Sequence, residues 1–176
     1  MRAALGYTAA SLPTGVGAEA RLLAVVCALR VRRSGWAPLP GGLVGSLRLA
    51  APGRAVGELA ESGWFEAAGP GRCGSGVWVA ELAGRPGGLR AGQWALRMLA
   101  RPGVAALQVP GRLAALAVAA WAEGPGEPFV LDAAQVARSC GLTVDQFTGR
   151  LMSVRDAGVV AGWVLSANGL LTCRAV

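Results

Sequence analysis

The sequence contains no histidine and no lysine. Histidine is the commonest general base and a frequent metal ligand, so its absence argues against acid–base and metal-dependent catalysis. The serine and cysteine residues have no histidine to activate them, and no pair of carboxylates is framed by other catalytic residue types. We therefore predict that the protein is not an enzyme and uses no cofactor and no metal.

Closely spaced cysteines and long apolar runs are also missing. The four cysteines (Cys27, Cys73, Cys140 and Cys173) form no C-x-x-C pair, so a zinc or redox site is not expected. The longest apolar runs, residues 22–29 and 113–122, fall far short of the roughly 20 residues that span a membrane. Residues 5–13 are too polar for a signal peptide. These features predict a cytoplasmic protein with no membrane partner and with buried free thiols.

All 17 basic residues are arginine, and the net charge is +7. This excess suits an acidic polymer such as nucleic acid. Arginine is accompanied by abundant glycine and alanine, which all have GC-rich codons, so its frequency alone is weak evidence for phosphate binding. Residues 1–40, 41–85, 86–128 and 129–176 carry net charges of +4, 0, +2 and +1.

The C-terminal third has the clearest pattern. An alanine- and leucine-rich helix is expected at residues 112–123, followed by a short strand at 129–131. Asp132 with Gln135, and Thr143 with Gln146, have the spacing of helix N-caps with capping boxes. The second of these helices places Val144, Phe147, Leu151 and Val154 on one apolar face and ends at Gly158. Strands at 159–165 and 170–176 flank the turn residues Asn168 and Gly169.

This order of helix, strand, helix, helix and hairpin resembles the winged-helix family of helix-turn-helix domains, over residues 112–176. The helix at 112–123 is apolar nearly all round, so it has to be buried in the domain or against a partner. We therefore expect a homodimer or tight packing of the two halves.

The N-terminal half repeats the pattern less clearly. Helices are expected at 18–33 and 43–50, and a third opens at Pro52 and stops at Gly63. Strand-like segments follow at 64–68 and 76–82. Aligning Gly63 with Gly158 gives an offset of 95 residues that also pairs Val56 with Leu151. Such a repeat indicates duplicated domains.

The predicted fold is therefore mainly α with small β-hairpins, an α+β class. It would consist of an N-terminal extension (1–14), a first winged-helix-like domain (15–83), a linker (84–109) with a helix at 89–101, and a second winged-helix-like domain (110–176).

In winged-helix proteins the third helix enters the major groove of DNA and the hairpin touches its backbone or minor groove. The resemblance therefore implies DNA contacts in both copies and at the basic end of the first helix. The candidate residues are Arg32, Arg33, Arg48, Arg54, Arg72, Thr143, Gln146, Thr148 and Arg150. Gln suits adenine, Arg suits guanine, and Thr suits phosphates.

Several of these residues have a second interpretation. Gln146 also fits a capping box and Arg150 a solvated surface charge. Arg32 and Arg33, with Arg30, also fit ordinary solvation at a helix end, and Asp145 is unfavourable beside phosphate. Arg72 lies in a glycine-rich segment that lacks the Lys-Ser/Thr end of a phosphate loop, so it fits a hairpin tip better.

Two functions remain open. The first is sequence-specific binding of double-stranded DNA, as a transcription regulator or as a replication or partition factor of a mobile element. The alternative is a winged-helix protein–protein adaptor or assembly subunit that does not bind DNA.

Overall fold

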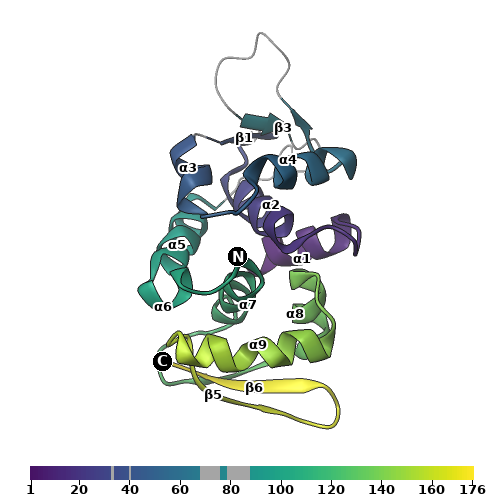
Figure 1. The fold of residues 1–176 in the computed structure, drawn as a ribbon. Coiled ribbons are helices and arrows are strands. Elements are labelled where there is room, and N and C mark those ends of the chain that lie inside the picture. The colour runs from purple at the N-terminus through teal and green to yellow at the C-terminus, as the bar shows by residue number, and fades with distance from the viewer. Residues whose placement is uncertain (33, 40, 68–75, 79–87) are drawn as a thin grey trace. The chain divides into compact units, whose positions relative to one another are not determined.

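The computed structural model describes residues 1–32, 34–39, 41–67, 76–78 and 88–176. Tertiary contacts divide the chain into two compact units. The N-terminal unit contains residues 3–97 with Met1, and the C-terminal unit contains residues 98–176 with Arg2. Each unit combines helices with one three-stranded antiparallel sheet (Figure 1). The predicted α+β class is confirmed.

The N-terminal unit has the following helices and strands: α1 (Arg2–Ser11), α2 (Ala18–Arg30), β1 (Trp36–Pro38), α3 (Gly41–Ser46), α4 (Pro52–Glu61), β2 (Glu66–Ala67) and β3 (Gly76–Trp78). Its strand order is β1-β3-β2. The helix α5 (Leu89–Ala100) follows, and the division between the units falls inside it.

The core of the N-terminal unit forms around α2, whose side chains from Ala20 to Leu29 are all buried. α2 packs against α4 and β1. Arg21 is buried near the start of α2, where its guanidinium donates to the carbonyls of Leu12, Pro13 and Val16. These bonds, made by Nε and Nη2, hold the loop between α1 and α2 against the start of α2.

Four expectations for this half need correction. The first helix ends at Arg30 rather than at residue 33, because the chain turns so that the Arg32 N–H donates to the Trp36 carbonyl. The second helix is α3, which ends at Ser46 because Arg48 takes a positive φ of 46°. The strand β1 was not predicted, because Pro38 is typical of a turn. Proline is nevertheless tolerated on an edge strand such as β1. Residues 68 and 79–82 of the predicted strands lie outside the described residues.

The fourth correction concerns residues 1–14, expected as an extension, which contain the helix α1. Trp64 ties α1 to the N-terminal unit, since its indole Nε1 donates to Ser11 Oγ at 3.0 Å and its ring lies 6.3 Å from that of Tyr7.

The C-terminal unit contains α6 (Pro102–Ala105), α7 (Val109–Ala119), β4 (Pro128–Asp132), α8 (Ala133–Cys140), α9 (Val144–Asp156), β5 (Val160–Leu165) and β6 (Leu170–Ala175). Its strand order is β4-β6-β5, and both pairings are antiparallel. α7, α8 and α9 pack on one another on one side of this sheet (Figure 1). The hairpin predicted between residues 159 and 176 is confirmed.

The alanine-rich helix is also present, but it lies three to four residues earlier than predicted. α7 begins at Val109 because Pro110, which lacks an N–H, fits its first turn. It ends at Ala119, where the N–H groups of Ala120 and Trp121 close the last turn. Its side chains from Leu113 to Val118 are buried. Within its own unit α7 packs against α8 and α9, which cover part of this apolar surface.

The two units repeat one another in detail. Both run helix, strand, helix, helix, strand, strand, and both place the third strand between the first and the second. α4 and α9 end with the same two hydrogen bonds: Gly63 to Ala60 and Trp64 to Leu59 in one unit, Gly158 to Arg155 and Val159 to Val154 in the other. Gly63 and Gly158 have φ values of 70° and 71°, and the offset between these pairs is the predicted 95 residues.

The first helices also correspond. Arg21 is the fourth residue of α2 and Arg112 is the fourth residue of α7, and both side chains are buried. Gly17 and Gln108, the residues before these helices, have nearly the same extended backbone conformation. The agreement at both ends of the three-helix arrangement indicates that the two units share one structural plan.

Candidate nucleic-acid interface

α9 is the helix with the best-defined ends and the largest set of predicted DNA contacts. Thr143 Oγ1 accepts from the Gln146 N–H at 3.2 Å, and Gln146 Oε1 accepts from the Thr143 N–H at 3.0 Å. This complete capping box satisfies two of the N–H groups that a helix start leaves open. Phe147, Leu151 and Val154 are fully buried and fix the helix to the core.

The polar residues at the start of α9 are partly engaged within the helix. The carbonyl oxygen of the Gln146 side chain is held by the capping box, so only its amide nitrogen is free to meet a base edge. Thr148 donates its hydroxyl to the Asp145 carbonyl at 3.1 Å. The capping interpretation of Gln146 is thus present in the structure, and any reading role would use its outward Nε2.

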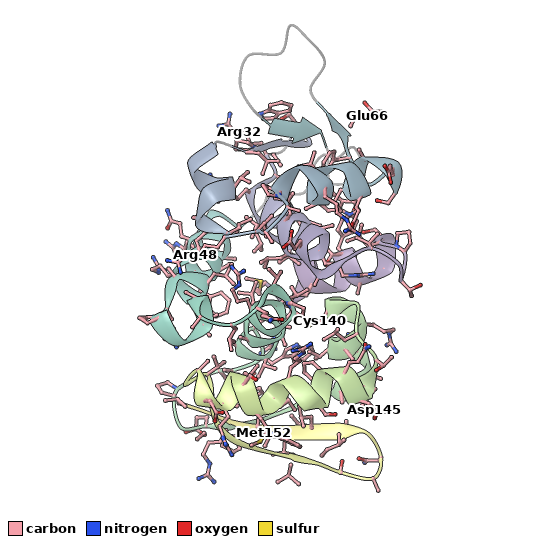
Figure 2. The ribbon with its side chains drawn as sticks, in the orientation of Figure 1. Arg32, Arg48, Glu66, Cys140, Asp145 and Met152 are labelled. Atoms are coloured by element: carbon pink, nitrogen blue, oxygen red, sulfur yellow. The ribbon has the colours of Figure 1, made fainter. Side chains whose placement is uncertain are left out.

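Arg150 is the exposed cation of α9 that remains unpaired. Within the part of the chain that the structure describes, it makes no ion pair or side-chain hydrogen bond. Arg155, by contrast, pairs with Asp156 at 3.0 Å. Asp145 is exposed near the N-terminal end of the helix (Figure 2). The exposed charges of α9 therefore balance, and Arg150 is its best candidate for contact with an anion or a guanine edge.

The hairpin that follows α9 is poorly suited to phosphate. Its turn is closed by Asn168, whose side-chain oxygen accepts from the Leu170 N–H at 3.3 Å, and by Gly169 with a φ of 80°. Beyond the turn, β5 and β6 expose Val164, Leu165 and Leu170 and carry one cation, Arg174.

In the N-terminal unit the predicted residues are dispersed. Arg54 lies on α4, where its Nε pairs with Glu58 at 3.0 Å, and its side chain is 81% exposed. Glu58 in turn accepts from the Gly17 N–H at 2.9 Å. Arg32 and Arg48 lie well apart (Figure 2). Arg33 and Arg72 lie outside the described residues.

Net charge is distributed unequally between the units. Residues 3–97 carry ten Arg and five Glu, a net charge of +5, whereas residues 98–176 carry six Arg and five acidic residues, a net charge of +1. Long-range attraction of a polyanion would therefore come mainly from the N-terminal unit.

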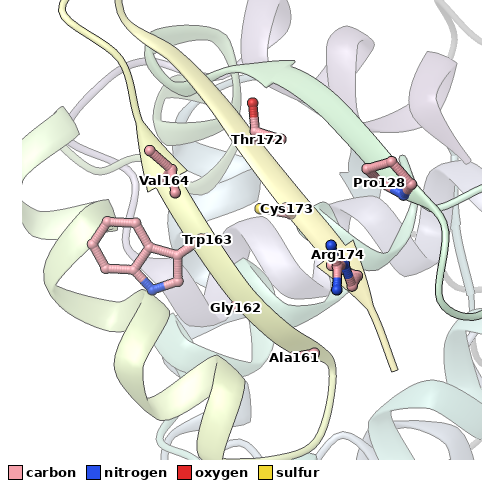
Figure 3. Close-up of a pocket in the computed structure, with 8 residues that line it drawn as sticks. All are labelled: Pro128, Ala161, Gly162, Trp163, Val164, Thr172, Cys173 and Arg174. Carbon is pink, nitrogen blue, oxygen red and sulfur yellow. The ribbon is translucent and has the colours of Figure 1, made fainter.

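A surface that the sequence analysis did not single out lies on the C-terminal sheet. A hollow of about 380 Å³ opens over β5 and β6 and is lined by Pro128, Ala161, Gly162, Trp163, Val164, Thr172, Cys173 and Arg174 (Figure 3). It forms where Gly162 offers no side chain and where the register between β5 and β6 shifts. A glycine inside a predicted strand is the signal that could have indicated this place.

The three cysteines that the structure describes, Cys27, Cys140 and Cys173, are buried and form no disulfide with one another. Burial raises the pKa of Cys27 to about 12, an effect that the nearby Arg30 opposes, and raises the pKa of Cys173 to about 11. Cys73 lies outside the described residues. Among the residues that are described, no cluster of His, Cys, Asp or Glu could hold a metal ion.

The described helices include none that is both long and apolar enough to cross a membrane. Comparisons of the chain with protein-family models, with curated proteins and with solved structures give no match.

Proposed function

We propose that the chain is a tandem winged-helix protein that binds double-stranded DNA sequence-specifically, as a transcription regulator or as a replication or partition factor of a mobile element. The observation that carries this proposal is the repeated unit, in which a third helix, α4 or α9, ends with the same pair of hydrogen bonds and is followed by two strands. A helix of this size fits the major groove, and its exposed N-terminal residues then face base edges.

The two units have different parts in this proposal. α9 supplies the reader, with Arg150 directed at guanine and the Nε2 of Gln146 at an acceptor such as adenine N7. The N-terminal unit, with its net charge of +5, supplies attraction to the phosphates. Arg32, Arg48 and Arg54 are its described candidates.

The experiment is a selection from a pool of random duplexes at two salt concentrations. We expect an enriched sequence, and we expect binding to weaken as salt rises, since phosphate contacts release counterions. Recovery of the pool without enrichment at either salt concentration would contradict sequence-specific binding.

One substitution separates the two interpretations of Gln146. Glutamate also completes a capping box, so Gln146→Glu preserves the start of α9 but replaces the amide donor with a carboxylate. We expect unchanged stability and lost affinity for the enriched duplex. Unchanged affinity would mean that Gln146 is a cap and not a reader.

A second candidate function is that of a protein–protein adaptor. It is favoured by the balanced charges of α9 and by the apolar side chains that the C-terminal sheet exposes. An adaptor would bind neither the selected nor a scrambled duplex at low salt, so the same selection distinguishes the two functions.

A further inference from the structure

The exposed large apolar side chains of the described residues are concentrated in the C-terminal unit. All of them lie between residues 130 and 176: Val130, Met152, Val164, Leu165, Leu170 and Val176. Val130 and Val164 are 54% and 69% exposed. Isolated exposed apolar residues are ordinary, but a concentration of them marks an interaction surface.

Three of these residues share one face of the β4-β6-β5 sheet, which we call the outer face. Directly opposed residues of antiparallel strands lie on the same side of a sheet. The observed register therefore gives three rows across the outer face. The arginine row is Pro128, Arg174 and Gly162; the valine row is Val130, Thr172 and Val164; the leucine row is Asp132 and Leu170.

The helices of the C-terminal unit lie on the opposite side of the sheet, and Figure 3 shows Val164, Thr172 and Arg174 projecting together from β5 and β6. The outer face thus lacks a cover from its own unit.

The outer face is complementary to itself. The arginine row has a positive charge and the hollow over Gly162, and the leucine row has a negative charge and the protruding Leu170, which is 41% exposed. The two rows flank the valine row at equal spacing. A two-fold axis along the valine row therefore places each arginine row over the leucine row of a second copy. Such a symmetric contact needs one patch that fits itself.

The charged groups on this face are able to form the resulting ion pairs. Arg174 has no partner within the described residues. Asp132 uses Oδ1 to accept from the Gln135 N–H at 2.9 Å as the cap of α8, and its Oδ2 is left for a second donor.

We propose that the protein forms a homodimer in which the outer faces of two β4-β6-β5 sheets pack against each other. Val130 and Val164 lie near the two-fold axis, Leu170 of each copy enters the hollow of the other, and Arg174 pairs with Asp132 of the second copy. Three short strands offer only about 15 Å by 20 Å of face. Over both copies this is roughly 600 Å², below the roughly 1,000 Å² of a stable interface, so the dimer is weak and reversible.

The test is sedimentation velocity of the full chain between about 1 and about 200 µM, in the range where small interfaces dissociate. We expect a concentration-dependent dimer. Val130→Glu and Val164→Glu each place two like charges near the axis and should raise Kd by about tenfold or more. Met152→Glu changes an exposed apolar residue of α9, away from the outer face, and should leave Kd within about twofold.

Two charge-neutralising variants test the proposed register. Asp132→Asn keeps an N-cap for α8 but removes the charge, and Arg174→Gln removes its partner. Each should raise Kd, and the double variant should be no worse than either one alone. A monomer at all concentrations would overturn the proposal. So would a raised Kd for Val164→Glu with an unchanged Kd for Val130→Glu, because that result would indicate pairing through the β5 edge. So would additive effects of the two neutralising changes. Circular dichroism of each variant verifies folding.

Discussion

Phe147 and Met152 lie on the same helix but contribute very differently to the stability of the fold. The Phe147 side chain is fully buried between the helices of the C-terminal unit, whereas Met152 is 47% exposed on the same helix. Truncating a buried side chain such as Phe147 leaves a cavity, whereas truncating an exposed side chain such as Met152 does not.

We therefore expect Phe147→Ala to lower the free energy of unfolding by about 3–5 kcal/mol. Met152→Ala, the control on the same helix, should change it by less than about 0.5 kcal/mol. Urea denaturation followed by circular dichroism measures both. A loss below about 1 kcal/mol for Phe147→Ala would mean that α9 is not anchored as described.

Cys27 gives a pH dependence with a defined sign. Its pKa is raised from 9.0 to about 12 in the fold, so above pH 9 the unfolded chain has lost a proton that the folded chain keeps. The contribution of Cys27 to stability is therefore complete below pH 9 and is lost as pH rises from 9 toward 12.

Cys27 should contribute a loss of about 1 kcal/mol per pH unit. Cys27→Ala should remove this part of the slope and leave the part that comes from Cys173, whose pKa is also raised. Denaturation of both proteins between pH 8 and pH 10.5 gives the difference. Parallel stability curves for the two proteins would contradict the burial of this thiol.

At the scale of elements, close backbone approach fixes the C-terminal end of α9. A Cβ on Gly103 of α6 would lie 2.6 Å from the Ala157 carbonyl oxygen, which is closer than real contacts allow. Gly149, in the middle of α9, has open space around its own Cβ position. The two glycines thus have opposite roles, one required for packing and one that weakens a helix.

Gly103→Ala should therefore destabilise the protein by about 1–3 kcal/mol, because α6 has to move away from α9. Gly149→Ala should stabilise it by about 0.5–1 kcal/mol, since alanine has the higher helix propensity. Thermal melting compares the two variants with the parent. Equal shifts of the same sign would refute the close approach.

The start of α9 offers a similar contrast. Thr143→Ala removes the capping oxygen and should cost about 1 kcal/mol. Thr148→Ala, only five residues along, removes a hydroxyl that bonds within the helix and should cost nothing or be slightly stabilising. Chemical denaturation of the two variants is the measurement, and a larger cost for Thr148→Ala would contradict the assigned cap.

Elements were predictable where local signals were strong. The capping box at Thr143, the stop at Gly158 and the turn at Asn168-Gly169 are local, and the structure has them where the sequence indicates. The strand β1 is held by pairing with β3, a partner 40 residues away, so no local pattern indicates it. α1 likewise depends on distant contacts such as Trp64 with Ser11.

For the candidate site, the sequence predicts which residues are exposed on α9 but not which of their atoms are already bonded. Sequence spacing predicts that Gln146 and Arg150 lie outside the core. It does not predict that the side-chain oxygen of Gln146 accepts from the Thr143 N–H or that Arg155 pairs with Asp156. The outer face was not predictable because its rows depend on the pairing of β4 with β6, whose residues are about 40 positions away in the sequence.

For the whole molecule, the unequal charge of the two units has a measurable consequence. If Arg32 contacts phosphate, Arg32→Ala should weaken binding to all duplexes alike and reduce the salt slope by about 1. Binding isotherms at several salt concentrations give the slope. An unchanged slope would assign Arg32 to solvated surface instead.

The most direct test of DNA reading by α9 is the affinity of the parent and of Arg150→Ala for the enriched duplex and for a scrambled one, at two salt concentrations. We predict that Arg150→Ala loses about 1–3 kcal/mol on the enriched duplex, relaxes the preference at one base pair and binds the scrambled duplex nearly as before. If folded Arg150→Ala binds both duplexes as tightly as the parent, α9 is an element of the core and does not read DNA.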